Sequence, residues 1–189
     1  DFVFPGTKLA CVNTEKLDED VAGNIEACFA LGRSRTPQQD IEFSIDELVE
    51  IALRALSPGI NDPFTAITAV HWLGAATAEI GQRQLCPATA EQGKLARVML
   101  RNDGFEHFVT RGFGAMRCAL ATSRIAALVA FDTLGRTAAQ LNDKGRRELL
   151  AREGDLLLEQ AETALGGPDL EELRERHGQF RRALLSLET

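Results

Sequence analysis

Apolar residues recur at helical spacing along most of the chain. Residues 18–32 combine an acidic first turn with apolar positions three and four apart, and residues 44–56 carry a second stripe of the same kind. Ser44 and Glu47 form a capping box that predicts the start of the second helix, and Pro58 predicts its end. Two helices joined by a polar loop are therefore expected in the first third of the chain.

Asp62 and Pro63 predict the start of a third helix. An aspartate side chain accepts hydrogen bonds from the first free backbone amides, and proline suits the first helical position. Asp103 and Glu106 repeat the capping pattern before another apolar stripe, and helices are also predicted over residues 123–142, 143–165 and 168–187. These segments predict a helical bundle of about six helices.

The last predicted helix has apolar positions separated by alternating steps of three and four. This spacing is typical of a coiled-coil seam, and over so short a length it also fits packing inside one bundle. Both alternatives stay open from the sequence, and the seam would give a contact for a homo-oligomer. It consists of Leu170, Leu173, His177, Phe180, Leu184 and Leu187.

Two short segments have the pattern of β structure. Residues 2–12 carry aromatic and β-branched side chains around a Pro5-Gly6 turn signal, and residues 95–101 alternate in apolar character. We expect a mainly α fold of the α+β class. The expected domain organisation is a small β-hairpin over residues 1–13 and a helical domain over residues 14–189, with one further short strand.

Composition narrows the classes of function. The formal net charge is -7, with 21 Lys and Arg against 28 Asp and Glu, so a basic surface for nucleic acid is not expected. The four cysteines include no Cys-x-x-Cys pair, which favours free thiols in a reducing compartment. Residues 63–80 are too rich in Ala, Thr and Gly for a membrane span, and a buried helix explains them better.

Two polar loops flank the second predicted helix. Their side chains would satisfy free amides and carbonyls at helix ends, or would form a cradle for a small anion. Arg35 and Asp40 are expected to hold the first loop by charge-assisted hydrogen bonds, and Glu50 and Arg54 to form a surface pair. The candidate ligand-binding residues are Arg35, Thr36, Gln39, Asp40, Arg54, Ser57, Asn61, Asp62 and Thr65.

Common enzyme motifs do not occur in the sequence. There is no Gly-x-Ser-x-Gly elbow, no Walker lysine loop and no dinucleotide fingerprint, and the three histidines lack metal-ligand spacing. Asp40, Glu42 and Asp62 would offer oxygen ligands to Mg²⁺ or Ca²⁺ only if the fold brought them together. Neither a metal nor a cofactor is expected.

The loop residues belong to a longer motif, which consists of Arg35-Thr36, Gln39-Asp40, residues 48–63 and Thr65-Ala66. The motif resembles the signature of a bacterial predicted membrane protein family known as domain of unknown function 2254. The resemblance includes residues 1–7 and weakens beyond Leu141, and Ser44 stands where the family commonly has Gly. It implies that a membrane-embedded N-terminal region of several helices precedes a soluble C-terminal domain.

The resemblance also implies the setting of this domain. Residues 1–13 would be the junction to the membrane region, which would be a partner of the domain, and the domain would lie on the cytoplasmic side of the inner membrane. We expect a regulatory, ligand-sensing or assembly role, with a small anionic ligand and self-association. The alternative is a hydrolase-type or divalent-metal-dependent site that uses Asp40 and Asp62 with Arg35 and Arg54.

Overall fold

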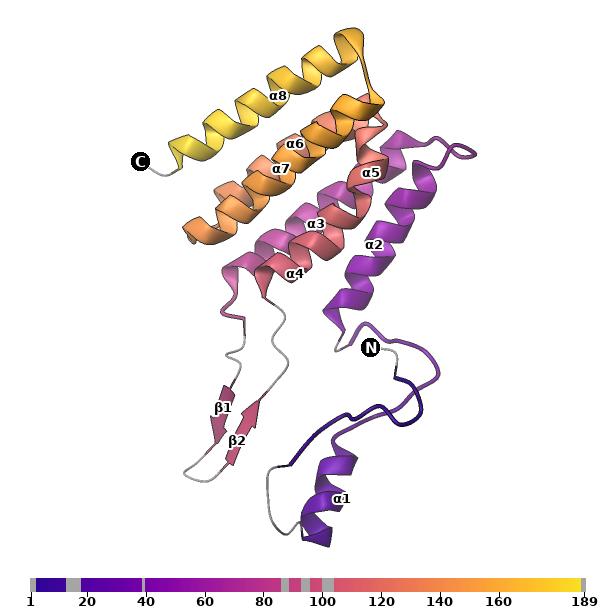
Figure 1. Ribbon diagram of the computed structural model, residues 1–189, viewed down its shortest axis with the longest axis vertical. Helices are drawn as coiled ribbons and strands as arrows, with labels where there is room; N and C mark the ends of the chain where they lie inside the picture. Colours follow the sequence, from indigo (N-terminus) through magenta and orange to yellow (C-terminus); the bar gives the residue numbers. More distant parts are fainter. Residues whose placement is uncertain are drawn as a thin grey trace. The chain divides into compact units, whose positions relative to one another are not determined.

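A computed structural model describes residues 3–12, 18–38, 40–85, 89–92, 96–99 and 104–187 (Figure 1). The chain divides into an N-terminal unit, residues 1–43, and a C-terminal unit, residues 44–189. The described elements are α1 (Glu19–Ala27), α2 (Ile41–Ala55), α3 (Pro63–Gln82), β1 (Thr89–Gln92), β2 (Ala96–Met99), α4 (Phe105–Val109), the π-helical turn η1 (Thr110–Gly114), α5 (Ala115–Ala121), α6 (Arg124–Ala139), α7 (Lys144–Ala164) and α8 (Gly167–Ser186). The fold is mainly helical, and the described part holds more helices than the six expected.

The N-terminal unit lacks the predicted hairpin in its described residues. The Pro5-Gly6 turn forms, because the Thr7 amide donates to the Phe4 carbonyl at 3.0 Å and Gly6 has a φ of 85°. No strand flanks it within residues 3–12, so the expected β-hairpin is wrong there, and residues 1, 2 and 13 lie outside the described residues. The side chains around the turn are mostly exposed, so no buried apolar face stabilises a strand pair.

β1 and β2 form an antiparallel pair in which Thr89 lies opposite Met99 and Gln92 opposite Ala96. β2 falls inside the range in which a short strand was expected, residues 95–101. Its partner is β1 and not the N-terminal segment. Among the described residues, the two strands therefore pair only with each other, in the segment that connects α3 to α4.

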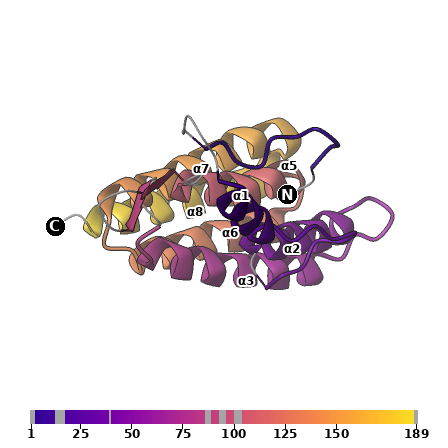
Figure 2. The same ribbon diagram turned by 90° about the horizontal axis from the view of Figure 1, so that it is seen from below.

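The C-terminal unit is a bundle in which α6 packs against α3, α7 and α8 (Figures 1 and 2). In Figure 1, α6, α7 and α8 lie side by side in orange to yellow. Apolar stripes on these helices form one core. Its largest fully buried side chains include Ile45, Leu73, Phe113, Met116, Leu120, Phe131, Leu134, Leu150 and Leu173. None of the described helices combines the length and the apolarity needed to cross a membrane.

The predicted start of the second helix needs a correction. α2 begins at Ile41, and Ser44 is an exposed residue inside its first turns. The Phe43 amide donates to the Asp40 side chain at 3.0 Å, so Asp40 takes the capping role predicted for Ser44. Asp103 lies outside the described residues, and α4 follows Gly104 without a side-chain cap. Several residues that can cap a helix occur within one turn of the start of α2 and of α4. At α2, the capping residue predicted from sequence spacing was therefore wrong.

The apolar seam of α8 packs inside the chain. Leu170, Leu173, Phe180 and Leu184 are buried in the core of their own bundle. His177 contacts the Phe131 ring edge-on, with 5.5 Å between ring centroids, and hydrogen-bonds through Nε2 to Asp155 at 2.8 Å. The alternative of bundle packing is confirmed, and use of this seam as an oligomer contact is wrong. Self-association itself stays a prediction.

α3 and α6 approach closely at Gly74. A Cβ atom there would lie 2.2 Å from Thr133 Cγ2, and the Thr137 hydroxyl donates to the Gly74 carbonyl at 3.2 Å. The Thr133 hydroxyl donates to the Val129 carbonyl at 2.8 Å, which fixes its rotamer and keeps its methyl group toward α3. Only glycine fits at this crossing, because any side chain would push the two helices apart.

We therefore predict that Gly74→Ala destabilises the protein by about 2 kcal/mol, because the steric cost exceeds the gain in helix propensity. Gly178→Ala is the matched control, since its Cβ would meet only the end of the Arg182 side chain at 3.4 Å. It should be neutral or stabilise by about 0.5 kcal/mol. Chemical denaturation of both variants measures the difference. Equal effects of the two substitutions would show that the crossing is not tight.

Candidate functional site

Arg35 and Asp40 form the expected charge-assisted pair in the N-terminal unit. Arg35 Nε donates to Asp40 Oδ2 at 2.8 Å, and the guanidinium carbon lies 5.2 Å from the centroid of the Phe43 ring. Asp40 Oδ1 accepts from the Phe43 amide, so one carboxylate joins the loop to the start of α2. The prediction of this pair is confirmed. Thr36 is exposed in the same loop, and Gln39 lies outside the described residues.

The hydrogen bond from Arg35 is the largest cause that lowers the pKa of Asp40 below the ordinary aspartate value, and the Phe43 amide acts in the same direction. Because the folded pKa is depressed, the ionised carboxylate contributes stability above the ordinary aspartate pKa. That contribution is lost as the pH falls through the folded value. Asp40 is therefore an anion at neutral pH and is already hydrogen-bonded.

The second loop is a tight corner between α2 and α3. The Ser57 hydroxyl donates to the Arg54 carbonyl at 2.7 Å, and the Asn61 amide donates to the Ser57 carbonyl at 2.9 Å. Asn61 has a φ of 50°, a left-handed conformation that asparagine tolerates better than most residues. The Asp62 amide donates to the Ala55 carbonyl at 2.8 Å and closes the corner. These polar groups satisfy the end of α2.

Asp62 caps α3 as predicted. Its Oδ1 accepts from the amides of Phe64 and Thr65, both at 3.1 Å, and its Oδ2 accepts from the Thr65 hydroxyl at 2.5 Å. The Thr65 hydroxyl is the main cause that lowers the pKa of Asp62, followed by the Thr65 amide. Both carboxylate oxygens are thus engaged by the first turn of α3.

The predicted residues form two separate groups. Arg35, Thr36 and Asp40 belong to the N-terminal unit, whereas the C-terminal unit holds Arg54, Ser57, Asn61, Asp62 and Thr65, which lie at or beside the α2–α3 corner. Arg54 pairs with Glu50 one turn earlier, as expected for a surface pair. Among the described residues, His, Cys, Asp and Glu side chains do not gather in a group of three or more that could hold a metal ion. A role of these residues in ligand binding stays a prediction.

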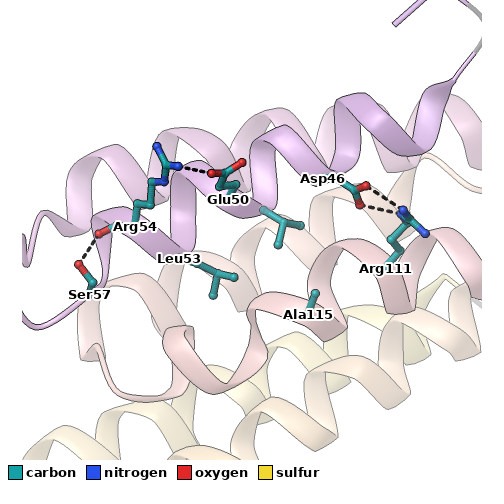
Figure 3. Close-up of a pocket in the computed structure, with 8 residues that line it drawn as sticks. Asp46, Glu50, Leu53, Arg54, Ser57, Arg111 and Ala115 are labelled. Atoms are coloured by element: carbon teal, nitrogen blue, oxygen red, sulfur yellow. Dashed lines mark hydrogen bonds and ion pairs between the residues drawn. The ribbon is translucent and has the colours of Figure 1, made fainter. Parts of the chain in front are cut away.

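A groove of about 510 Å³ runs beside α2 in the C-terminal unit (Figure 3). Its apolar part is formed by Val49 and Leu53 of α2 and by Ala115 of α5. Charged and polar side chains surround this part, and they include two residues of the predicted set, Arg54 and Ser57. The full lining is Asp46, Val49, Glu50, Leu53, Arg54, Ser57, Arg111 and Ala115.

Asp46 and Arg111 form a two-pronged ion pair at the groove. Arg111 Nε donates to Asp46 Oδ1 and Nη2 to Oδ2, both at 2.7 Å, which is the two-pronged geometry of an arginine–carboxylate pair. Arg111 lies in η1, and such π-helical turns often occur at functional sites. The two residues are 65 positions apart in the sequence, and no spacing or motif in the sequence predicted their contact.

Residues 1–136 match the family described as "Predicted membrane protein (DUF2254)". The chain belongs to this family. Uncharacterized proteins of Mycobacterium bovis and of two strains of Mycobacterium tuberculosis are each 53% identical to it over 55 residues. The matched stretch is 29% of this chain and only 11% of each relative. No solved structure matches the chain.

The cap geometry at Asp62 gives a direct test. Asp62→Ala should lower the melting temperature by about 3 °C, because two amides and the Thr65 hydroxyl lose their acceptor. Asp62→Asn should come close to the wild type, because its amide oxygen still accepts from the backbone. Circular dichroism melts measure both, with Glu171→Ala on the exposed face of α8 as the control. If the asparagine variant were as unstable as the alanine variant, Asp62 would not stabilise the protein by capping α3.

Proposed function

We propose that this chain is a regulatory or assembly domain of a bacterial membrane protein, and that it holds a segment of that protein's own membrane-anchored region in the α2 groove. The observation that carries the proposal is the contrast between charged and apolar groups. Three charged residues of the motif, Arg35, Asp40 and Asp62, are hydrogen-bonded at helix ends. The groove, in contrast, exposes apolar side chains between its ion pairs. Membership of a predicted membrane protein family supports the membrane setting.

Leu53 is the central residue of this proposal. It is 39% exposed although it lies in a concave surface, beside Val49 and Ala115. An apolar side chain of a partner would remove this surface from water, and the Asp46–Arg111 and Glu50–Arg54 pairs would border the contact. Such a rim of charge pairs favours specificity more than affinity. The groove therefore suits an apolar segment of a polypeptide.

A small anionic ligand suits the groove less well. Arg54 and Arg111 each already bind a carboxylate, so an anion at either guanidinium would compete with Glu50 or Asp46 and would lie beside its negative charge. The expectation of such a ligand stays a prediction, and we assign the groove to the protein's own membrane region. We place the domain on the cytoplasmic side, which agrees with its cysteines and the lack of a disulfide motif.

The contacts at Asp40 and Asp62 do not favour the hydrolase alternative. A general base works best when its pKa lies near the operating pH, whereas both carboxyl groups have pKa values below the ordinary aspartate value. Their oxygens accept hydrogen bonds from residues that hold the loop or cap a helix. Hydrolysis at these residues stays a prediction that no described contact supports.

Site-specific photo-crosslinking in the full-length protein in native membranes tests the proposal. A benzophenone amino acid in place of Leu53 should crosslink to a peptide of the same polypeptide that lies outside residues 1–189. Leu185, which is 62% exposed on α8, is the matched control position and should give no such product. Mass spectrometry identifies the crosslinked peptides.

The crosslink at position 53 should also weaken strongly when Ala115→Arg fills the opposite side of the groove. Products confined to residues 1–189, to lipid or to an unrelated protein would each overturn the assignment. An equal crosslinking yield from positions 53 and 185 would also overturn the assignment, because the yield would then depend only on the exposure of the substituted side chain.

A further inference from the structure

The outward face of α3 carries two exposed aromatic rings and no charge over most of its length. Residues 63–78 include no Asp, Glu, Lys or Arg, although 26% of the chain is charged. Phe64 is 70% exposed and Trp72 is 65% exposed, and Thr68, His71 and Ala75 are exposed as well. A helix with one face in water normally carries charged residues there. The composition of this face indicates that another surface covers it.

These residues form one continuous strip. At about 100° per residue, Phe64, Thr68, His71, Trp72 and Ala75 all fall within an arc of about 100° on the helix surface. The remaining side of α3 is buried, with Leu73 and Val70 fully covered, and α3 is held against α6 by the close crossing at Gly74. The strip therefore faces away from the bundle and cannot rotate inward.

We infer that a second copy of this chain covers the strip, with α3 packed antiparallel against α3 about a twofold axis that passes between His71 and Trp72. In a twofold contact the same surface serves both subunits, so it must be complementary to itself. This register places Thr68 opposite the partner's Ala75. The two small side chains leave room beside the axis for the ring of Trp72.

The charges at the two ends of α3 fit this arrangement. Antiparallel helices bring the positive end of one dipole beside the negative end of the other. Asp62 stands at the N-terminal end of α3 and Arg83 at the C-terminal end, so an antiparallel contact brings the helix end that carries Asp62 toward the end of the other helix that carries Arg83.

Arg83 also has a position that suits the partner's Phe64. Arg83 Nε and Nη2 donate to Glu79 Oε1 at 3.2 and 2.9 Å, which folds the guanidinium back to the level of residue 79. Residue 79 lies opposite the partner's Phe64 in the proposed register. The guanidinium can then lie against that ring as a cation–π contact.

A lipid surface fits the strip less well. Helices that lie on anionic membranes combine aromatic side chains with several Lys and Arg residues. Within residues 62–85, the stretch that contains α3, Arg83 is the only Lys or Arg, and it is hydrogen-bonded to Glu79. Four aromatic rings across a twofold contact would bury on the order of 500 Å², well below the roughly 1,200–2,000 Å² of a stable interface, so we expect a weak dimer that forms only at high protein concentration. The inference does not depend on the groove, which is formed by other residues of α2, η1 and α5.

Trp72 makes the test direct, because it is the only tryptophan in the chain. Sedimentation velocity and tryptophan emission are measured on the whole chain across a range of concentrations. The sedimentation coefficient should rise with concentration, and the emission should shift to shorter wavelength over the same range.

Three variants test the register. Ala75→Arg should raise the concentration at the midpoint of dimerisation by about tenfold or more, because it buries two unpaired charges beside the axis. The double variant Thr68→Glu with Ala75→Arg should recover most of the loss, because each arginine then faces the partner's glutamate. Ala139→Arg, at an exposed alanine of α6, is the matched control and should leave the midpoint unchanged.

Several results would overturn the inference. One is a monomer at every concentration with red-shifted emission, and another is a monomer whose emission is blue-shifted at all concentrations, which would mean that the chain's own residues cover the strip. A shift that occurs only with phosphatidylglycerol vesicles would assign the strip to lipid. A dimer in which Ala75→Arg acts like Ala139→Arg would move the interface elsewhere, and failure of the double variant to rescue would exclude the antiparallel register.

Discussion

The close packing of α3 on α6 is the contact on which the rest of the C-terminal unit depends. Gly74 lets the two helices approach, and the Thr137 hydroxyl bonds to its carbonyl across the gap. Because one side of α3 is held in this way, Phe64 and Trp72 must face outward. The start of α3 also fixes the corner with α2, and α2 forms one wall of the groove. Both proposed interaction surfaces thus depend on one helix crossing.

Charged side chains around α2 stabilise helix ends and join helices. Asp40 caps α2 and binds Arg35, Asp46 joins α2 to η1 through Arg111, and Asp62 caps α3. Each of these carboxylates accepts hydrogen bonds, so Asp40 and Asp62, two of the acids considered as general bases or metal ligands, stabilise the fold. The two surfaces that we propose for partners, the α2 groove and the outer strip of α3, expose apolar side chains. This distribution is why we propose binding and assembly for this domain and not hydrolysis.

Contacts between residues close in sequence could be predicted. The Asp62 cap and the Arg35–Asp40 pair each lie within five residues, where local geometry decides the partner. The cap at Ser44 was wrong because Asp40, one turn earlier, is an equally good capping residue. The α8 seam was ambiguous because core packing and coiled-coil pairing use the same spacing. The Asp46–Arg111 pair could not be predicted from the sequence, because only the folded bundle brings these two residues together.

The claim that the motif carboxylates serve the structure is tested most directly by their titration. Carbon-detected NMR of the intact chain follows the side-chain carboxyl resonances, with Asp40→Asn and Asp62→Asn used to assign the two signals. We predict that both groups titrate below the ordinary aspartate pKa, since Arg35 and the Thr65 hydroxyl stabilise the ionised forms. The Asp40 pKa should rise in Arg35→Ala. A pKa near neutrality for either carboxyl group would contradict this structural role and would make that residue a candidate general base.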